Sequence, residues 1–371
     1  MVKIYLLPAD EGDFIWIRYG KGEKYANIIV DGGTKSSGKE YAEVIENIAE
    51  RGEKVEALVL THIDYDHLQG AVEGISRLSA EVLKKVVKRI LFNTCRGILR
   101  KQKKDKSRNV CAEDQIKGNV PSKAYGIEDA ISFMDLLREK GMIDCLTDYV
   151  VSGTEMIFDK GALVKMISPG KKELERFLNE WEPYCKEKGV ISYATNHEMT
   201  KSNLKDLVNA KLGSDPSPNN GASIAFLFEY EGVKAAFLGD AKPTVCMRGL
   251  KELDLKMPYA VDAVKLSHHG SRSNTSDSLL KNLRTQTYLL STNGKGQKVP
   301  NKAMIAHLLK NAEERGIQLL CNYDWWRITY HGGYFTDEDK VGFLDANMLD
   351  LYRLDENGIE IKDGLKIYGE W

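Results

Sequence analysis

The sequence predicts an α/β fold in which two mixed β-sheets pack together and are flanked by helices, an αββα sandwich. Short apolar segments rich in strand formers alternate with segments of helical periodicity along most of the 371 residues, an order typical of layered α/β architecture. The hydrophobic content is 42% and the charged content 29%, which is ordinary for a globular protein. The chain has no internal repeat and no low-complexity linker, so one domain of two sheets fits better than two independent domains.

The first half of the chain alternates between strands and helices. Its predicted elements are strands at residues 3–8, 14–19, 26–31 and 55–60 and helices at residues 39–51, 71–78, 127–140 and 171–188. The first of these helices is predicted because Tyr41, Val44, Ile45 and Ile48 recur at helical spacing. The third strand ends in Asp31-Gly32-Gly33, where glycine permits a tight turn.

The second half is richer in strands. Its predicted elements are strands at residues 223–230, 233–238, 260–266, 287–291 and 317–322 and helices at residues 276–283 and 302–315. Residues 203–220 are expected to form a loop, because they contain Gly213, Pro216 and Pro218. We expect a domain over residues 1–335, with basic or helical insertions near 84–140 and 171–215. Residues 336–371 are expected to form a strand-rich extension that covers a sheet edge or a partner surface.

Four residues with metal-binding side chains follow the predicted strand at 55–60. They are His62, Asp64, Asp66 and His67. A single histidine or aspartate at a strand end is usually a surface or capping residue, but four within six residues are harder to explain in that way. Imidazoles and carboxylates at this spacing can build two adjacent cation sites, as metal-assisted hydrolysis requires.

A second group of such residues lies far along the chain. Asp240 and the pair His268 and His269 each follow an apolar strand, so we expect them at the same sheet edge as the first group. The two oxygens of a carboxylate such as Asp240 can each bind one cation and so bridge two ions.

With these motifs the chain resembles the metallo-β-lactamase fold hydrolases, whose hallmark is HxHxDH, and most closely the branch that contains the hydrolase domain of ComEC-type DNA-uptake proteins. The segments that resemble this branch are EGDFIWI at 11–17, IIVDGG at 28–33, NNGAS at 219–223, FLGD at 237–240 and VKLSHHGS at 264–271. They cover most of residues 1–320 in the expected order. The membrane-spanning part of the ComEC-type proteins has no counterpart here, so the resemblance does not imply DNA uptake.

The chain departs from the wider pattern at three places. Asp64 stands where the wider superfamily has a second histidine, and this harder ligand favours Mn²⁺ or Mg²⁺ without excluding Zn²⁺. The superfamily also has a histidine between the first cluster and the bridging aspartate, for which His197 is the only candidate. Val299-Pro300 stands where the ComEC-type branch often has His-Pro.

The resemblance implies a site for two divalent ions, Zn²⁺ or Mn²⁺. One ion would be held by His62, Asp64 and Asp240, and the other by Asp66, His67, Asp240 and one of His268 and His269. The ions would share a hydroxide that attacks phosphorus or a carbonyl carbon. The remaining histidine would contact a phosphate oxygen or protonate the leaving group, so Asp66, His268 and His269 are the catalytic candidates. Which of the two adjacent histidines is the ligand stays open.

The favoured substrate is a phosphodiester in DNA or RNA. Residues 84–108 contain eleven Lys or Arg residues and are a candidate to follow a nucleic-acid backbone. The candidate substrate-binding residues are Asn220, Ser271, Arg272, Lys101, Lys103 and Lys104. Each feature also has an ordinary explanation, because lysine-rich tracts are commonly solvated surface and Ser271 can cap the helix near residue 276. Trp325 and Trp326 could stack on bases, although a tandem Trp is more often part of the core.

Two other functions stay open at this point. One is a small-molecule hydrolase acting on a phosphoester, lactone or β-lactam, and the other is a non-catalytic metal-binding partner module. The 53 basic and 54 acidic residues nearly cancel, so the overall charge indicates no particular partner. The first ten residues do not resemble a secretory signal, and no apolar run approaches the length of a membrane helix. We therefore expect a cytoplasmic protein with a nucleic-acid substrate and no membrane segment; a protein partner stays open.

Overall fold

The computed structural model describes residues 1–101, 125–184, 202–295, 299–312, 315–327, 333–362 and 365–370. Its main sheet consists of two mixed halves. In spatial order, the first half contains β6 (Leu146–Thr147), β5 (Ile90–Leu91), β4 (Lys54–Val59), β3 (Lys24–Val30), β2 (Ile15–Lys21) and β1 (Val2–Leu6). The second half contains β15 (Ile317–Cys321), β14 (Thr287–Leu290), β12 (Ala263–Lys265), β10 (Val233–Phe237), β9 (Ala225–Tyr230), β8 (Leu163–Ser168) and β7 (Glu155–Ile157).

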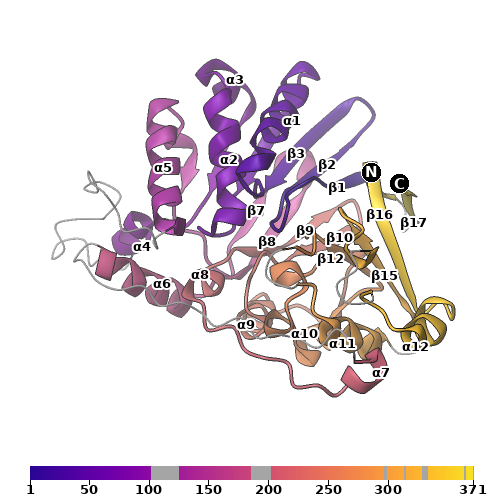
Figure 1. The fold of residues 1–371 in the computed structure, drawn as a ribbon. Coiled ribbons are helices and arrows are strands. Elements are labelled where there is room, and N and C mark those ends of the chain that lie inside the picture. The colour runs from indigo at the N-terminus through magenta and orange to yellow at the C-terminus, as the bar shows by residue number, and fades with distance from the viewer. Residues whose placement is uncertain are drawn as a thin grey trace.

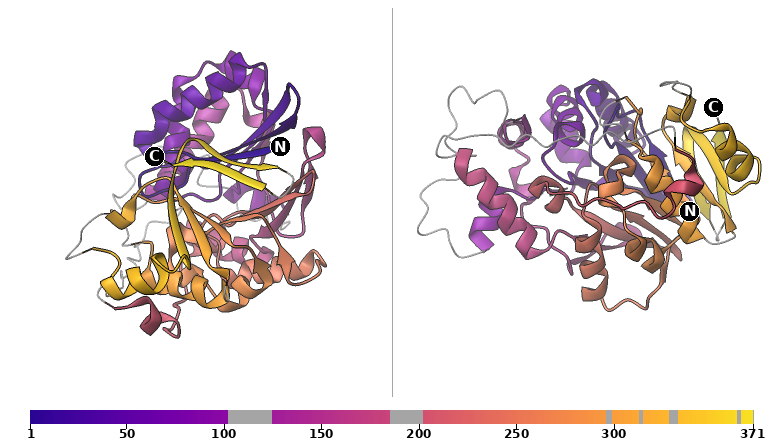
Figure 2. Two further views of the ribbon diagram at one scale, coloured as in Figure 1. Left: turned by 90° about the vertical axis from the view of Figure 1, so that its right-hand side faces the viewer. Right: turned by 60° about the horizontal axis from the view of Figure 1, so that its bottom comes forward.

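One long strand joins the two halves. The first residues of β16 (Leu349–Lys362) pair in parallel with β15, and its last residues pair antiparallel with β1. Figure 2 shows β16, in yellow, between the indigo strands of the first half and the orange strands of the second. Strand β17 (Leu365–Glu370) pairs with β16, and β11 (Tyr259–Ala260) and β13 (Leu283–Arg284) form a separate small sheet.

Helices cover both outer faces, so the predicted αββα arrangement is confirmed (Figure 1). The helices packed against the first half are α1 (Gly38–Glu50), α2 (Tyr65–Arg77), α3 (Ala80–Val86) and α5 (Tyr125–Glu139). Those against the second half are α9 (Pro243–Glu252), α10 (Asp277–Asn282) and α11 (Lys302–Ala312). The remaining helices are α4 (Cys95–Lys101), α6 (Lys171–Tyr184), α7 (Leu204–Leu207), α8 (Pro218–Gly221) and α12 (Asp337–Asp339).

The core between the two halves is strongly apolar. It contains Ile17 and Val30 from the first half and Phe226, Phe228 and Phe237 from the second, all almost fully buried. The rings of Phe226 and Phe237 stack with their centres 5.1 Å apart. Burial of this surface on both sides of the strands is the main favourable contribution to such a sandwich.

The predicted strands and helices agree with the structure, apart from their ends and three segments. The single strand expected at 260–266 is instead two short strands, β11 and β12, which belong to different sheets. Strand β8 and helix α9 were not predicted. The helix expected at 71–78 already begins at Tyr65, because the polar residues of its first turn hide its apolar periodicity. The loop expected at 203–220 contains the short helices α7 and α8; in α8, Pro218 occupies the first turn and Ser217 accepts a hydrogen bond from Asn220 N. The last residues of the helix expected at 171–188 lie outside the described part of the chain.

The C-terminal segment forms strands that pair with the edges of both sheet halves, and β17 pairs with β16 alone among the described strands. Its strand β16 pairs on both sides, with β15 and β1, because its two ends belong to different halves of the sheet. The division of the chain at residue 335 stays a prediction.

Strand ends determine where the polar residues meet. The neighbouring parallel strands β3 and β4, and likewise β10, β12 and β14, run in one direction within each half. Because parallel strands end at the same sheet edge, the residues that follow them gather there. Among the described residues, no helix is both long and apolar enough to cross a membrane.

Candidate metal centre

Side chains from four segments meet at this edge. His62 follows β4, Asp240 follows β10, His269 follows β12, and Asp66 and His67 lie in the first turn of α2. All five are at most 3% exposed, so the cluster is buried rather than a set of surface residues. The structure therefore brings the two groups of candidate ligands together. Asp64 is more open, with a side chain that is 34% exposed.

A close backbone contact holds the first turn of α2 in place. The loop between β1 and β2 passes so near that a Cβ at Gly12 would lie 1.6 Å from the carbonyl oxygen of Asp66. The amide of Asp13 donates to the same oxygen at 3.3 Å. Only glycine fits at residue 12, because any side chain would displace the turn that carries Asp66 and His67.

Asp240 lies at the centre of the cluster. Its Oδ1 is 3.3 Å from Nε2 of His67 and 3.9 Å from Nε2 of His269. Its Oδ2 is 3.7 Å from Nε2 of His62 and 3.6 Å from Nε2 of His268. Each oxygen of this carboxylate thus faces two imidazole nitrogens, as the predicted bridging role requires.

The two other aspartates of the first cluster lie on opposite sides of this centre. Asp66 Oδ2 is 3.4 Å from Nε2 of His269 and 4.0 Å from Nε2 of His67. Asp64 Oδ2 is 3.5 Å from Nε2 of His62, while its Oδ1 accepts a hydrogen bond of 2.7 Å from Asn219.

Asp31 orients two of the histidines. Its Oδ2 accepts a hydrogen bond of 2.8 Å from Nδ1 of His67 and one of 2.7 Å from the hydroxyl of Thr61. That hydroxyl lies 3.0 Å from Nδ1 of His62 and is placed to accept its proton. With their Nδ1 protons held in this way, both rings present the lone pair of Nε2 to the centre.

The other two histidines are held in a similar way. Nδ1 of His269 lies 3.0 Å from the carbonyl oxygen of Ser291, and Nδ1 of His268 lies 2.9 Å from the side-chain oxygen of Asn274. We assign the Nδ1 proton of each ring to these acceptors. All four imidazoles then direct Nε2 toward Asp240, the arrangement that metal-binding histidines show in proteins.

Two buried atoms of the centre indicate that a cation fits there. Nε2 of His62 and Oδ1 of Asp240 have no hydrogen-bond partner among the described residues. Leaving such an atom unpaired costs about 1–3 kcal/mol. Divalent cations at this centre would satisfy both atoms, and the mixed imidazole and carboxylate ligands suit Zn²⁺ or Mn²⁺. The same geometry brings Asp66, His67 and His269 close enough to share an ion.

The charges of the centre are strongly coupled. Burial alone would lower the pKa of both adjacent histidines, but Asp240 and Asp215 raise that of His268 to about 10, and Asp240 and Asp13 raise that of His269 to about 9. Burial would raise the pKa of Asp66, yet the neighbouring imidazoles lower it to about 2. Protons on the imidazoles thus balance the carboxylates where no cation does so, and a bound cation would displace them.

A buried ion pair lies behind the centre. Lys265 and Asp13 are at most 1% exposed, and Nζ of the lysine is 2.5 Å from Oδ2 of the aspartate. The other oxygen of Asp13 is 3.4 Å from Nδ1 of His269. The lysine balances one of the negative charges gathered around the histidines.

The sequence motifs contained Asp13, Asp31 and Lys265, but no role was predicted for them. Asp215 and Asn274 were missed altogether, since nothing in their local sequence distinguishes them from ordinary turn residues. For Asp13, Asp31 and Lys265, their place in the motifs at 11–17, 28–33 and 264–271 was the available signal.

Several predicted substrate-binding residues have other contacts in the structure. Ser271 is buried and its hydroxyl accepts from Ser273 N, so it caps the turn over residues 272–274 rather than the helix near residue 276. The side chain of Asn220 donates to Asp215 at 2.7 Å. The backbone amide of Arg272 donates to Asn301. A role for these residues toward substrate stays a prediction.

Two residues in the described part of the basic tract form ion pairs. Lys88 pairs with Glu56 and Asp159, and Arg100 pairs with Asp148. Lys101 is exposed at the end of α4. Lys103, Lys104 and His197 lie outside the described residues.

The tandem tryptophans do not form an exposed stacking surface. Trp325 is 2% exposed and packs edge-on against Trp326 and Tyr334, with ring centres 5.4 Å and 4.8 Å apart. It belongs to the core beneath the second half of the sheet. The ordinary explanation of this pair is therefore confirmed for Trp325.

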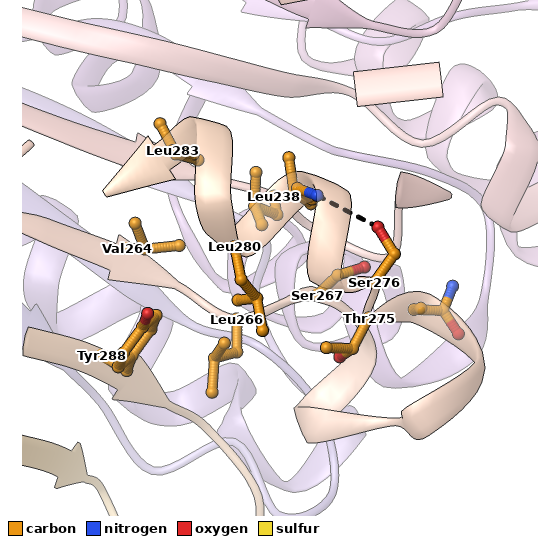
Figure 3. A pocket seen from close by; sticks show the side chains of 11 residues that line it. Leu238, Val264, Leu266, Ser267, Thr275, Ser276, Leu280, Leu283 and Tyr288 are labelled. Atoms are coloured by element: carbon orange, nitrogen blue, oxygen red, sulfur yellow. Dashed lines mark hydrogen bonds between the residues drawn. The ribbon is translucent and has the colours of Figure 1, made fainter. Parts of the chain in front are cut away.

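A small cavity lies next to the histidine turn, beneath α10 (Figure 3). Its volume is about 10 Å³, and its walls include Leu238, Leu266 and Tyr288. A space of this size holds about one water molecule, so it is a packing defect rather than a substrate site. The hydroxyl of Ser276 caps α10 at its rim by accepting from Leu279 N.

We expect the substitution Asp31→Asn to weaken metal binding by about 10–100-fold, the usual effect of removing a carboxylate behind a metal-binding histidine. Asparagine suits this position, because residue 31 has a φ of 55° and asparagine tolerates left-handed backbone. The measurement is a competition titration of metal-stripped protein with a chromophoric chelator. Asp345→Asn, at an exposed position, is the control, and equal affinities in the two variants would contradict the role of Asp31.

One family model matches the first part of this chain. Residues 15–122 match the family model described as the metallo-beta-lactamase superfamily, a stretch that contains His62, Asp64, Asp66 and His67. A search of curated proteins found no match.

Among solved structures, a mutant of the CmlA beta-hydroxylase is 12% identical, with a TM-score of 0.41 over 86% of this chain and 52% of that protein. The chain thus spans about half the length of that hydroxylase. The MIM-2 metallo-beta-lactamase is 11% identical, with a TM-score of 0.31 over 83% of this chain and 91% of that one. The Rm3 metallo-beta-lactamase is also 11% identical, with a TM-score of 0.27 over 71% of this chain and 77% of that one.

Residues 15–122 match the family model, and helices flank two sheet halves whose shared edge carries the clustered histidines and aspartates. We conclude that this chain has the metallo-β-lactamase fold.

Proposed function

We propose that this protein is a metal-dependent phosphodiesterase of the ComEC-type branch that cleaves DNA or RNA. The observation that carries the hydrolytic part is the convergence of four Nε2 atoms on the two oxygens of Asp240. The motifs at 11–17, 28–33, 219–223 and 264–271, which resemble the ComEC-type branch, support the phosphodiester.

Two divalent cations, when bound, would activate water and neutralise the negative charge that develops on the substrate. The residues of the chain prepare the site for this. Asp31 holds the Nδ1 proton of His67 and, through Thr61, that of His62, so both rings stay oriented without movement. Burial of the cluster excludes bulk water and strengthens every charge interaction in it.

The carboxylates set the charge of the site. Asp64, Asp66 and Asp240 contribute three carboxylates beside the histidines, and two divalent cations would offset their negative charges. Asp64, at 34% exposure, lies on the open side of the centre, from which a substrate would approach.

The test uses metal-stripped protein supplied with Mn²⁺ or Zn²⁺. Linear, circular and single-stranded DNA, RNA and a generic phosphodiester are offered separately, with His67→Ala as the control for contaminating nuclease. Cleavage of a polymer by the wild type and not by the variant supports the proposal. Cleavage of the generic ester alone indicates a small-molecule hydrolase instead, and failure to bind any divalent cation leaves only a binding role.

A further inference from the structure

The turn after β12 has an unusual backbone. His268 and His269 have φ angles of 48° and 52°, and Gly270 follows with 82°. Left-handed backbone is unfavourable for residues other than glycine, and residues held in such conformations cluster at functional sites. The turn is held by hydrogen bonds from His268 N to Gly239 O and from Ser271 N to His268 O, at 2.9 and 2.8 Å.

This backbone directs the two imidazoles to different sides of Asp240. Their rings are inclined by 78°, with centres 5.8 Å apart. Nε2 of His269 faces Oδ1 of Asp240, together with His67, whereas Nε2 of His268 faces Oδ2, together with His62. The side chain of His268 is 16% exposed and that of His269 is 1% exposed, so His268 lies on the open side with Asp64.

We propose that both histidines are metal ligands, one for each ion, and that Asp215 positions the first of them. In this assignment one ion would be bound by His62, Asp64, His268 and Oδ2 of Asp240. The other ion would be bound by Asp66, His67, His269 and Oδ1 of Asp240. Each ion then has two imidazoles and two carboxylates. The inference rests on the proposed function, because it requires that divalent cations bind at this centre.

Asp215 forms the back of the His268 site. Its side chain is 6% exposed, and its Oδ2 accepts hydrogen bonds from Asn220 at 2.7 Å and from Asn274 at 2.8 Å. The same oxygen lies 3.6 Å from Nδ1 of His268. Asn274 uses its other side-chain atom, Oδ1, as the 2.9 Å acceptor for Nδ1 of His268. Asp215 therefore fixes the orientation of the Asn274 amide, and this amide fixes the orientation of the His268 ring.

One contact bears on the tautomer of His268. Nδ2 of Asn220 lies 3.3 Å from Nδ1 of the ring. Because Nδ2 is a hydrogen-bond donor, this contact would favour an unprotonated Nδ1. We assign the proton to Nδ1 because the Asn274 oxygen is closer and because the Asn220 amide donates to Asp215 over the shorter distance of 2.7 Å. Nε2 then carries the lone pair that a metal ligand needs.

The arrangement parallels that of the other three imidazoles. Asp31 supports His67 directly and His62 through Thr61, and the Ser291 carbonyl supports His269. His268 thus has polar support behind its Nδ1 like the other three imidazoles, which favours the same role as a ligand. Burying the Asp215 carboxylate costs free energy. A role in orienting His268 at an ion site explains why a carboxylate is buried there.

The experiment measures metal binding and needs no substrate. Metal-stripped wild type, His268→Ala, His269→Ala and Asp215→Asn are titrated with Co²⁺, with stoichiometry from elemental analysis and the visible spectrum recorded at each step. Asp206→Asn, an exposed change in the same segment, is the control. His268→Gln replaces the alanine variant should that one not fold, as judged by thermal melting and circular dichroism.

We expect the wild type to bind two ions. His268→Ala should bind one ion normally and lose the other, with at least a 100-fold fall in its affinity. His269→Ala should lose the other ion of the pair, with a different remaining spectrum. Asp215→Asn should weaken the same ion as His268→Ala by about 10–100-fold and leave the second unchanged, a selectivity that general destabilisation would not produce.

The outcomes separate the two proposals. Two ions bound by His268→Ala with wild-type affinities would overturn the assignment of His268 while leaving a two-ion centre in place. Equal weakening of both ions by Asp215→Asn would overturn its positioning role. A wild type that binds no ion would overturn the proposed function itself, and this inference with it.

Discussion

Asp240→Asn should abolish most of the metal-dependent activity of this protein. Both oxygens of Asp240 face pairs of imidazole nitrogens, at distances between 3.3 and 3.9 Å. Asparagine has the same shape, but it is neutral and offers only one oxygen, so both ions should bind more weakly. Metal ions contribute several kcal/mol of charge stabilisation in such reactions, and each ~1.4 kcal/mol is a factor of ten. We therefore expect hydrolysis to fall by about a thousandfold or more.

The measurement combines metal content after dialysis with the rate of hydrolysis at saturating Mn²⁺ or Zn²⁺. Asp345→Asn makes the same chemical change at an exposed residue and should leave both unchanged. Thermal melting of the metal-free proteins shows whether Asp240→Asn folds. A folded Asp240→Asn protein that keeps two ions and its activity would show that this aspartate does not bridge the centre.

Above neutrality the stability of the metal-free protein should fall with rising pH, and the stabilisation by added metal should grow. In the metal-free protein the pKa values of His268 and His269 are raised to about 10 and about 9 by neighbouring carboxylates, and that of His67 is also raised well above its usual value. An unfolded histidine has a pKa of about 6.5. The stabilisation by these groups is therefore complete below about pH 6.5 and is lost as pH rises through 9 to 10.

At acidic pH the stability of the metal-free protein should change with pH in the opposite direction. Burial alone would raise the pKa of Asp66, but the adjacent imidazoles lower it to about 2. This group therefore stabilises the metal-free protein above the usual aspartate pKa, near 4, and its contribution disappears as pH falls toward 2. Metal binding requires the imidazoles to lose their protons, so the stabilisation by added metal should increase as pH rises from 6.5 toward 10.

Thermal melting between pH 5 and 10, with a chelator in one series and excess metal in the other, checks this prediction. The melting temperature of the metal-free protein should fall from pH 7 to 10, and the increase on adding metal should grow over the same range. His269→Gln removes one of the titrating imidazoles and should flatten the metal-free series. A metal-free melting temperature that rises from pH 7 to 10 would contradict the protonated state of these histidines.

Much of the site could be predicted from local sequence, because ligand residues follow apolar strands. His62, Asp240 and His269 each come directly after a strand, and parallel strands end at one edge. The start of α2 could not be predicted in this way, since its first turn consists of ligands rather than residues of the apolar face. Likewise, β16 could not be placed, because alternation along a strand does not say which strands it will pair with.

Local patterns identified the candidate metal ligands and the strands that end at the centre, because hydrophobic periodicity and residue type are properties of neighbouring positions. Tertiary structure alone decided how those residues are oriented. It brought Asp215 and Asn274 behind His268, placed Asp31 behind His67 and buried Lys265 against Asp13. These contacts join residues that are 6 to 252 positions apart, and the direction of a side chain depends on its neighbours in space rather than along the chain.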